Sequence, residues 1–245
     1  MLAAFRYLIL AILVVFIAPV LVHAGLWLSE DRPGSWSSAD WSSAGILPPA
    51  RDEPEPSIRV MAARTGGLKG IVSVHTWLVL KHRDAPAYDR YDVVGWGDPV
   101  RRNSRPADGR WYSNAPVVIY ELRGDPAERL LPEVEAAIRD YQWSERGSYR
   151  IWPGPNSNTF VARVLAAVPE LRADMPPTAV GRDFPAGRWV NRTPTGVSLT
   201  IGGFAGLTLG WREGVEMHLL GLVAGVRFQH FAVLLPGFGA LGQSL

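Results

Sequence analysis

The chain has 245 residues and a formal net charge of +2, which fits one domain of ordinary size plus an anchor. Apolar residues make up 47% of it, enough for a true core, and this excludes a disordered chain. The absence of cysteine excludes disulfides, thiolate metal sites and cysteine nucleophiles. The weak net charge, with no long Lys/Arg run, gives no support for a nucleic-acid partner.

The N-terminal segment predicts a membrane helix. No charged residue lies between Arg6 and Glu30, and the stretch from Tyr7 to Leu28 is close to the ~20 residues that cross a bilayer. Arg6 favours a cytoplasmic N-terminus, which places the rest of the chain on the periplasmic, extracytoplasmic side of an inner membrane. A cleavable signal ending at Val22-His23-Ala24 is the alternative. Because the apolar run exceeds the ~7–15 residues of a signal sequence, we expect a retained single-pass anchor over residues 1–28.

Residues 29–57 have the composition of a linker, with several prolines and serines. However, Trp36 and Trp41 lie inside this segment. Two tryptophans are unusual in a free linker, so we expect the segment to pack on the body. Residues 58–245 then form a single domain.

The first half of the body predicts strands and two helices. Apolar, β-branched runs predict strands over Ile71–Leu80, Tyr91–Trp96 and Val117–Leu122. Asp125 and Glu128 suggest a capping box at the start of a helix that Pro132 should kink or restart. A second helix is expected over Ser157–Ala167.

After Pro176-Pro177 the pattern changes to period two. Val197, Leu199 and Ile201 alternate with polar residues, as do Val215 and Met217. Glycines separate these runs, which predicts antiparallel hairpins. The fold class is therefore α+β, with one N-terminal transmembrane helix and a hairpin-rich C-terminal sheet.

The sequence gives no support for a cofactor or a metal. Its histidines are scattered, and none forms a pair at metal-ligand spacing on a helix. The glycines at Gly202, Gly203 and Gly206 lie in hairpin-like sequence and not at a strand-to-helix turn, so dinucleotide binding is not indicated.

One pair of residues suggests chemistry. Ser157 opens the second predicted helix, where the partial positive charge of the helix end can stabilise an anion. His75 lies within the most apolar predicted strand and can serve as a base if the strand and helix meet. The structural alternative is that Ser157, or a neighbouring asparagine, caps its helix while His75 is hydrogen-bonded in the core.

Several stretches resemble an uncharacterised bacterial envelope family catalogued as domain of unknown function 3750. They are WSSAGILPP, ARTGGLKG, VHTWLVLK, YDVVGWG, RWYSNAP, YRIWPGPNSNTFVA and LPGFG, and they cover nearly the whole chain. This resemblance implies no established activity.

A more distant similarity is to permuted papain-like domains of the NlpC/P60 type. It implies a papain-like fold in which His75 is the strand histidine and Ser157 stands at the position of the nucleophilic cysteine. Asp92 would be the third, orienting residue, and Asn156, Asn158 and Trp152 would bind the ligand. The serine departs from the pattern, because a hydroxyl lacks the low pKa and the nucleophilicity of a thiol.

Three functions follow from these observations. The first is a membrane-anchored envelope domain whose papain-like cleft binds a peptide or a lipid-linked ligand. The second is a serine-variant amidase or acyl hydrolase that uses Ser157 and His75. The third is a structural envelope protein.

Overall fold

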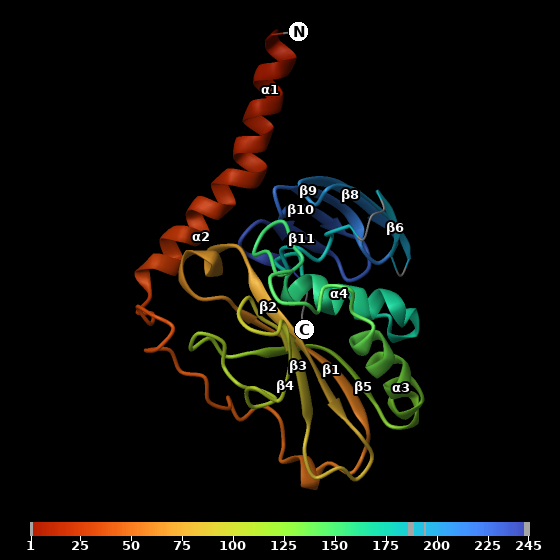
Figure 1. Cartoon of the computed structure of the whole chain (residues 1–245). Helices are drawn as coiled ribbons and strands as arrows, with labels where there is room; N and C mark the ends of the chain where they lie inside the picture. Colours follow the sequence, from red (N-terminus) through yellow and green to blue (C-terminus); the bar gives the residue numbers. More distant parts are fainter. Residues whose placement is uncertain (1, 186–188, 194, 243–245) are drawn as a thin grey trace.

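A long N-terminal helix and two antiparallel sheets make up the fold (Figure 1). The computed structural model describes residues 2–185, 189–193 and 195–242. The first sheet has the strand order β4-β3-β2-β1-β5. This architecture confirms the α+β class with an N-terminal apolar helix. The strands of the first sheet are β1 (Ser57–Arg64), β2 (Val74–Lys81), β3 (Asp89–Val93), β4 (Val100–Arg102) and β5 (Val117–Arg123).

The central strands of the first sheet are covered on both faces. All eight residues of β2 are buried, which explains why its sequence is apolar almost throughout. On one face, Leu78 packs in a core with Phe160 and other residues of α3 (Asp125–Arg139) and α4 (Ser157–Ala167). On the other face, Trp77 lies in a second core that Trp41 helps to cover.

Helix α3 differs from the sequence prediction at its start and at Pro132. Its N-cap is Gly124, with φ 68° and no side-chain cap, so the predicted capping box does not form. Asp125 and Glu128 instead bind the Arg83 guanidinium. The helix continues through Pro132 without restarting.

The predicted strand boundaries also need correction. Ile71 ends a 3-10 helix (Gly67–Ile71), so β2 begins at Val74, later than the apolar run suggests. Strand β3 is shifted toward the N-terminus and ends at Val93. Strands β1 and β4 were not predicted. In β1, the charge of the fully buried Arg59 interrupts the apolar pattern.

The segment after the N-terminal helix runs along the first sheet. Trp41 makes edge-to-face contacts with Trp111 and Tyr112, at centroid distances of 5.1 and 4.8 Å. The Asp108 carboxylate accepts hydrogen bonds from the Ser43 hydroxyl and from two backbone N–H groups of this segment. Trp36 is 49% exposed, although it also contacts Trp41. The segment is thus attached to the body through Trp41, Ser43 and a series of backbone hydrogen bonds.

The second sheet is a meander of seven antiparallel strands, in the order β12 to β6. Its hairpins confirm the structure expected from the period-two pattern. The strands are β6 (Val190–Arg192), β7 (Gly196–Ile201), β8 (Ala205–Gly210), β9 (Gly214–Leu219), β10 (Leu222–Arg227), β11 (Ala232–Leu235) and β12 (Gly239–Leu241).

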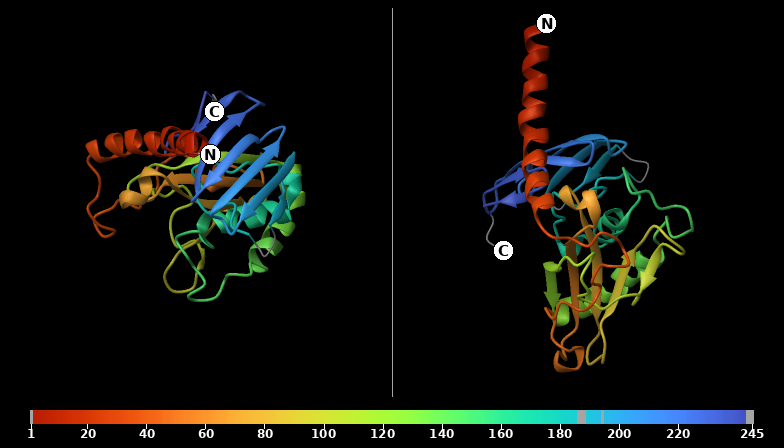
Figure 2. Two further views of the ribbon diagram at one scale, coloured as in Figure 1. Left: turned by 90° about the horizontal axis from the view of Figure 1, so that it is seen from above. Right: turned by 90° about the vertical axis from the view of Figure 1, so that its left-hand side faces the viewer.

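The N-terminal helix consists of α1 (Leu2–Ile12), a π-helical turn η1 (Leu13–Ile17) and α2 (Ala18–Ser29). From Ala3 to Ser29 it is long and apolar enough to cross a membrane. Its second half lies against the body: η1 contacts β10, and α2 contacts the 3-10 helix at Gly67–Ile71. Only the first half projects freely, as Figure 1 and the right-hand view of Figure 2 show.

Candidate functional site

His75 and Ser157 line the same cavity, which has a volume of about 300 Å³. His75 comes from β2 and Ser157 from the first turn of α4, and these two elements pack against each other. Most of the remaining lining is aromatic or aliphatic. It includes Trp96, Trp111, Tyr149, Trp152, Leu220 and Leu222.

Asn156 fixes the start of α4. Its side-chain oxygen accepts hydrogen bonds from the N–H groups of Asn158 and Thr159, and the Thr159 hydroxyl accepts one from the Asn156 N–H. This reciprocal arrangement is a capping box with threonine in the third helical position. The Asn156 amide nitrogen donates to the carbonyls of Ile151 and Val180, so the cap also fastens two flanking loops.

Asn158 fastens the same helix to β2. Its side-chain oxygen accepts a hydrogen bond from the Thr76 hydroxyl at 2.9 Å, and its nitrogen donates to the Val74 carbonyl at 2.9 Å. Thr76 and Val74 flank His75 in the chain. The hydrogen bonds therefore fix the first turn of α4 beside the backbone on either side of the histidine.

Ser157 has no part in the cap. Asn156 supplies the capping oxygen, and among the described residues no hydrogen bond takes up the Ser157 hydroxyl. The residue is 4% exposed and lines the cavity. The structure thus excludes the reading in which Ser157 serves as the helix cap.

His75 is held between an aromatic ring and a carboxylate. Its imidazole is stacked on the Trp111 indole, with centroids 3.6 Å apart. Its Nε2 lies 3.5 Å from Asp92 Oδ2, which is longer than a good hydrogen bond. The same oxygen accepts a hydrogen bond from Arg90 at 2.9 Å. Asp92 is therefore shared between the histidine and a buried arginine.

Burial dominates the electrostatics of this cluster. Desolvation lowers the pKa of His75, and the neighbouring Asp92 only partly offsets it. For Asp92, burial acts to raise the pKa, but His75 and Arg90 outweigh it and leave the pKa below its usual range. The histidine is consequently neutral at neutral pH and the aspartate is ionised, which are the protonation states that a general base and its orienting group require.

The arrangement can support attack by a serine. With Nε2 directed at Asp92, Nδ1 is the ring nitrogen that remains to act as a base. The Ser157 hydroxyl lies at the N-terminus of α4, where the helix dipole stabilises negative charge. Asn156 occupies the N–H groups of Asn158 and Thr159, so the Ser157 N–H is the first-turn donor that remains for an oxyanion.

The sequence-predicted ligand residues fall into two groups. Asn156 and Asn158 are buried, and their amides are occupied by hydrogen bonds inside the protein, so they position Ser157. Trp152 lines the cavity, is 42% exposed, and donates a hydrogen bond from Nε1 to the Leu220 carbonyl. It is the predicted ligand residue with a surface still free for contact.

Sequence reasoning missed Trp111 and Arg90. Trp111 is distant from His75 in the chain, and its stacking depends on the fold of the intervening loop. Its only signal was its place in the RWYSNAP stretch. Arg90 gave no signal, because a single arginine in a strand does not reveal that it is buried against an aspartate.

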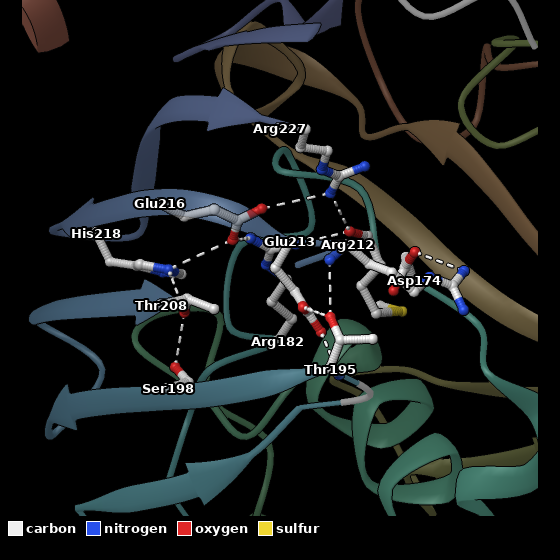
Figure 3. A network of polar contacts seen from close by, with 11 residues as sticks. Asp174, Arg182, Thr195, Ser198, Thr208, Arg212, Glu213, Glu216, His218 and Arg227 are labelled. Carbon is white, nitrogen blue, oxygen red and sulfur yellow. Dashed lines mark hydrogen bonds and ion pairs between the residues drawn. The ribbon is translucent and has the colours of Figure 1, made fainter. Parts of the chain in front are cut away.

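A second buried polar cluster lies beneath the C-terminal sheet (Figure 3). Glu216 pairs with Arg182 and lies 3.4 Å from Arg227. His218 Nδ1 is 3.2 Å from Asp183, and its Nε2 is 3.1 Å from the Thr208 hydroxyl. Burial acts to raise the pKa of Glu216, but the Arg182 charge and the His218 contact lower it to about 2. These residues fasten the sheet to the body and are not among those that line the cavity.

A protein-family model described as "Protein of unknown function (DUF3750)" matches residues 55–184. The chain belongs to this family. The match contains His75, Asp92, Trp111 and Ser157, and it ends before the C-terminal sheet begins. Searches of curated proteins and of solved structures find no match. The similarity to papain-like domains consequently stays a prediction.

Proposed function

We propose that this member of the family is a membrane-anchored envelope protein whose cavity binds a peptide or lipid-linked acyl group, and that Ser157 attacks the carbonyl of this ligand. The observation that carries the proposal is the shared cavity of Ser157 and His75, with Asp92 behind the histidine. The aromatic and aliphatic lining suits an apolar ligand. The apolar N-terminal helix and the orientation favoured by Arg6 support a site on the periplasmic side.

The proposed reaction is acyl transfer. The Ser157 oxygen forms a bond to the carbonyl carbon while His75 takes its proton. The carbon–nitrogen or carbon–oxygen bond of the ligand then breaks, and His75 returns the proton to the leaving group. Water hydrolyses the acyl-serine and regenerates the hydroxyl. This scheme makes the protein an amidase or acyl hydrolase.

Ligand binding without turnover is the second candidate. It is favoured by the serine itself, because a hydroxyl is a weaker nucleophile than the thiol that papain-like enzymes use. In that case the same cavity would hold its ligand unchanged. A purely structural envelope role is the third candidate. It does not explain why the Ser157 hydroxyl lines the cavity without a hydrogen bond to any described residue.

A serine-directed fluorophosphonate probe separates the hydrolase from the other two candidates. We expect it to label the full-length protein in detergent, and Ser157→Ala and His75→Ala should each abolish the labelling. Ser104→Ala, which alters an exposed serine, is the matched control and should leave the labelling unchanged. A folded wild-type protein that resists the probe would reject the nucleophile and leave ligand binding and the structural role as the candidates.

A further inference from the structure

The C-terminal sheet is inverted in polarity. Val190, Leu199, Leu207, Met217 and Ala224 lie directly opposite one another across five adjacent strands, so they share one face. Every member of this row is apolar. The next row, on the other face, runs through Asn191, Ser198, Thr208 and Glu216, and it is polar.

The apolar row is the one that faces outward. Val190, Leu199 and Met217 are 54%, 47% and 44% exposed, whereas Thr208 and Glu216 are 4% and 2% exposed. Ala224, at the end of the row, is 1% exposed and lies on β10, the strand that contacts η1. In a water-soluble protein, a sheet covered on one side has the opposite pattern, with apolar residues inward and polar residues outward. Large apolar surfaces left in contact with water are rare and indicate an interaction site.

The turns of the same sheet carry exposed aromatic residues. Trp211 in the β8–β9 turn is 71% exposed, and Phe228 and Phe231 in the β10–β11 turn are 51% and 67% exposed. Tryptophan and other aromatic side chains of this kind are typical of the boundary between lipid and water. This composition fits a lipid surface, and the position of the N-terminal helix decides between lipid and a protein partner.

The position of the N-terminal helix indicates that the outer face of the C-terminal sheet contacts the membrane that this helix would cross. Seen from above, the broad face of the sheet is turned toward the side on which the N-terminal end of the helix projects (Figure 2). Helix α1 has 11 residues and is therefore about 16 Å long, well short of the ~30 Å hydrocarbon core. The remaining length must come from η1 and α2, and η1 contacts β10 of the sheet.

We infer that the outer face of the C-terminal sheet is a lipid-contacting surface that lies in the near leaflet of the membrane crossed by the N-terminal helix. The placement of the sheet at the depth of the near leaflet rests on the membrane anchoring proposed above. The inverted polarity of the sheet does not depend on that anchoring. Since Leu220 and Leu222 line the cavity, the sheet also brings the cavity close to the membrane, where a lipid-linked ligand is present.

Single-cysteine spin labelling tests this inference, because the chain contains no cysteine of its own. Met217→Cys and Leu199→Cys place a nitroxide on the outer face of the sheet. Val14→Cys places one on an exposed position of the helix, and Ser104→Cys places one on an exposed loop of the body as a matched control. The full-length protein is reconstituted in vesicles of phosphatidylethanolamine and phosphatidylglycerol, and collisions of each label with oxygen and with a water-soluble nickel chelate are measured.

We expect collisions with oxygen to be the more frequent for labels at positions 217, 199 and 14. For the label at position 104, we expect collisions with the nickel chelate to be the more frequent. If Val14 faces lipid while Met217 and Leu199 face water, the inference is wrong and the anchor stands. If all four labels face water, both the inference and the anchor are wrong. Dipolar broadening between Met217 labels would show that a second copy of the chain covers the face, which also overturns the inference.

Discussion

The imidazole of His75 and the indole of Trp111 lie parallel, with an interplanar angle of 3° and centroids 3.6 Å apart. The stack leaves the histidine little freedom to rotate, so the orientation of its ring is set by a residue in a distant loop. Together with Asp92 at Nε2, it directs the opposite edge of the ring away from the carboxylate. This orientation is the basis of the proposed chemistry.

Asn156 and Ser157 should differ sharply in their contribution to stability. Asn156→Ala removes the cap of α4 and leaves buried N–H groups without an acceptor, so we expect a loss of about 1–2 kcal/mol in the free energy of unfolding. Ser157→Ala should stay within about 0.5 kcal/mol of wild type, because its hydroxyl caps nothing. Urea unfolding in mild detergent measures both values. A larger loss for Ser157→Ala than for Asn156→Ala would contradict the described helix start.

Trp41 and Trp36 provide a matched pair in the segment after the anchor. Trp41→Ala should destabilise the protein by ~2 kcal/mol or more, because the indole packs on Trp111 and Tyr112. Trp36→Ala should cost less, since half of its side chain is exposed. The same unfolding measurement checks this order. Equal effects of the two substitutions would indicate that the segment does not pack as described.

His75 and His218 should give stability opposite dependences on pH. The pKa of His75 is lowered by burial, so its contribution is complete above the ordinary value of 6.5 and is lost as the pH falls toward the folded pKa. Although burial acts to lower it, the pKa of His218 is raised by its contacts with Asp183 and Glu216. Its contribution is complete below 6.5 and is lost as the pH rises through the folded pKa.

Unfolding free energies measured across this pH range check both directions. His75→Gln should remove part of the loss on the acid side, and His218→Gln should remove part of the loss on the alkaline side. If either substitution instead reduced the loss of unfolding free energy on the other side of the pH range, the assigned environments of the two histidines would be wrong.

The elements that carry the site could be predicted because their signals are local. The apolar run around His75 and the helix at Ser157 depend on residues close in the chain, and so does the apolar N-terminal helix. By contrast, the capping box at Asp125 failed because Gly124, with its positive φ, begins the helix instead. The stack of Trp111 on His75 joins distant segments and has no local signature.

The C-terminal sheet shows a further limit of sequence patterns. The alternation of Val197, Leu199 and Ile201 with polar residues predicted strands correctly. Periodicity does not state which face is covered, and the usual assumption would place these residues inward. Here the polar face carries Glu216 and His218 against the body, so only the fold reveals the inversion.

The N-terminal segment is expected to remain attached to the mature protein. Its apolar stretch is long, and Trp27 is buried against the body at the far end of the helix. Intact-mass measurement of the protein extracted from the membrane fraction should return the full chain. A mature protein that begins at Gly25 and is released by osmotic shock would show that the segment is a cleaved signal.

The most direct test of the proposed site uses Ser157→Cys, which introduces the only thiol of the chain. The pH dependence of its alkylation rate gives the thiol pKa in the full-length protein. We predict a pKa below ~7.5, lowered by the N-terminus of α4 and by transfer of the thiol proton to His75, whose imidazolium then pairs with the thiolate, against ~8.5 for the exposed control Ser104→Cys. Adding His75→Ala should raise the pKa of the Ser157→Cys thiol toward the control. A thiol at position 157 that titrates at or above the control, and does so regardless of His75, would contradict the claim that the two residues form one chemical site.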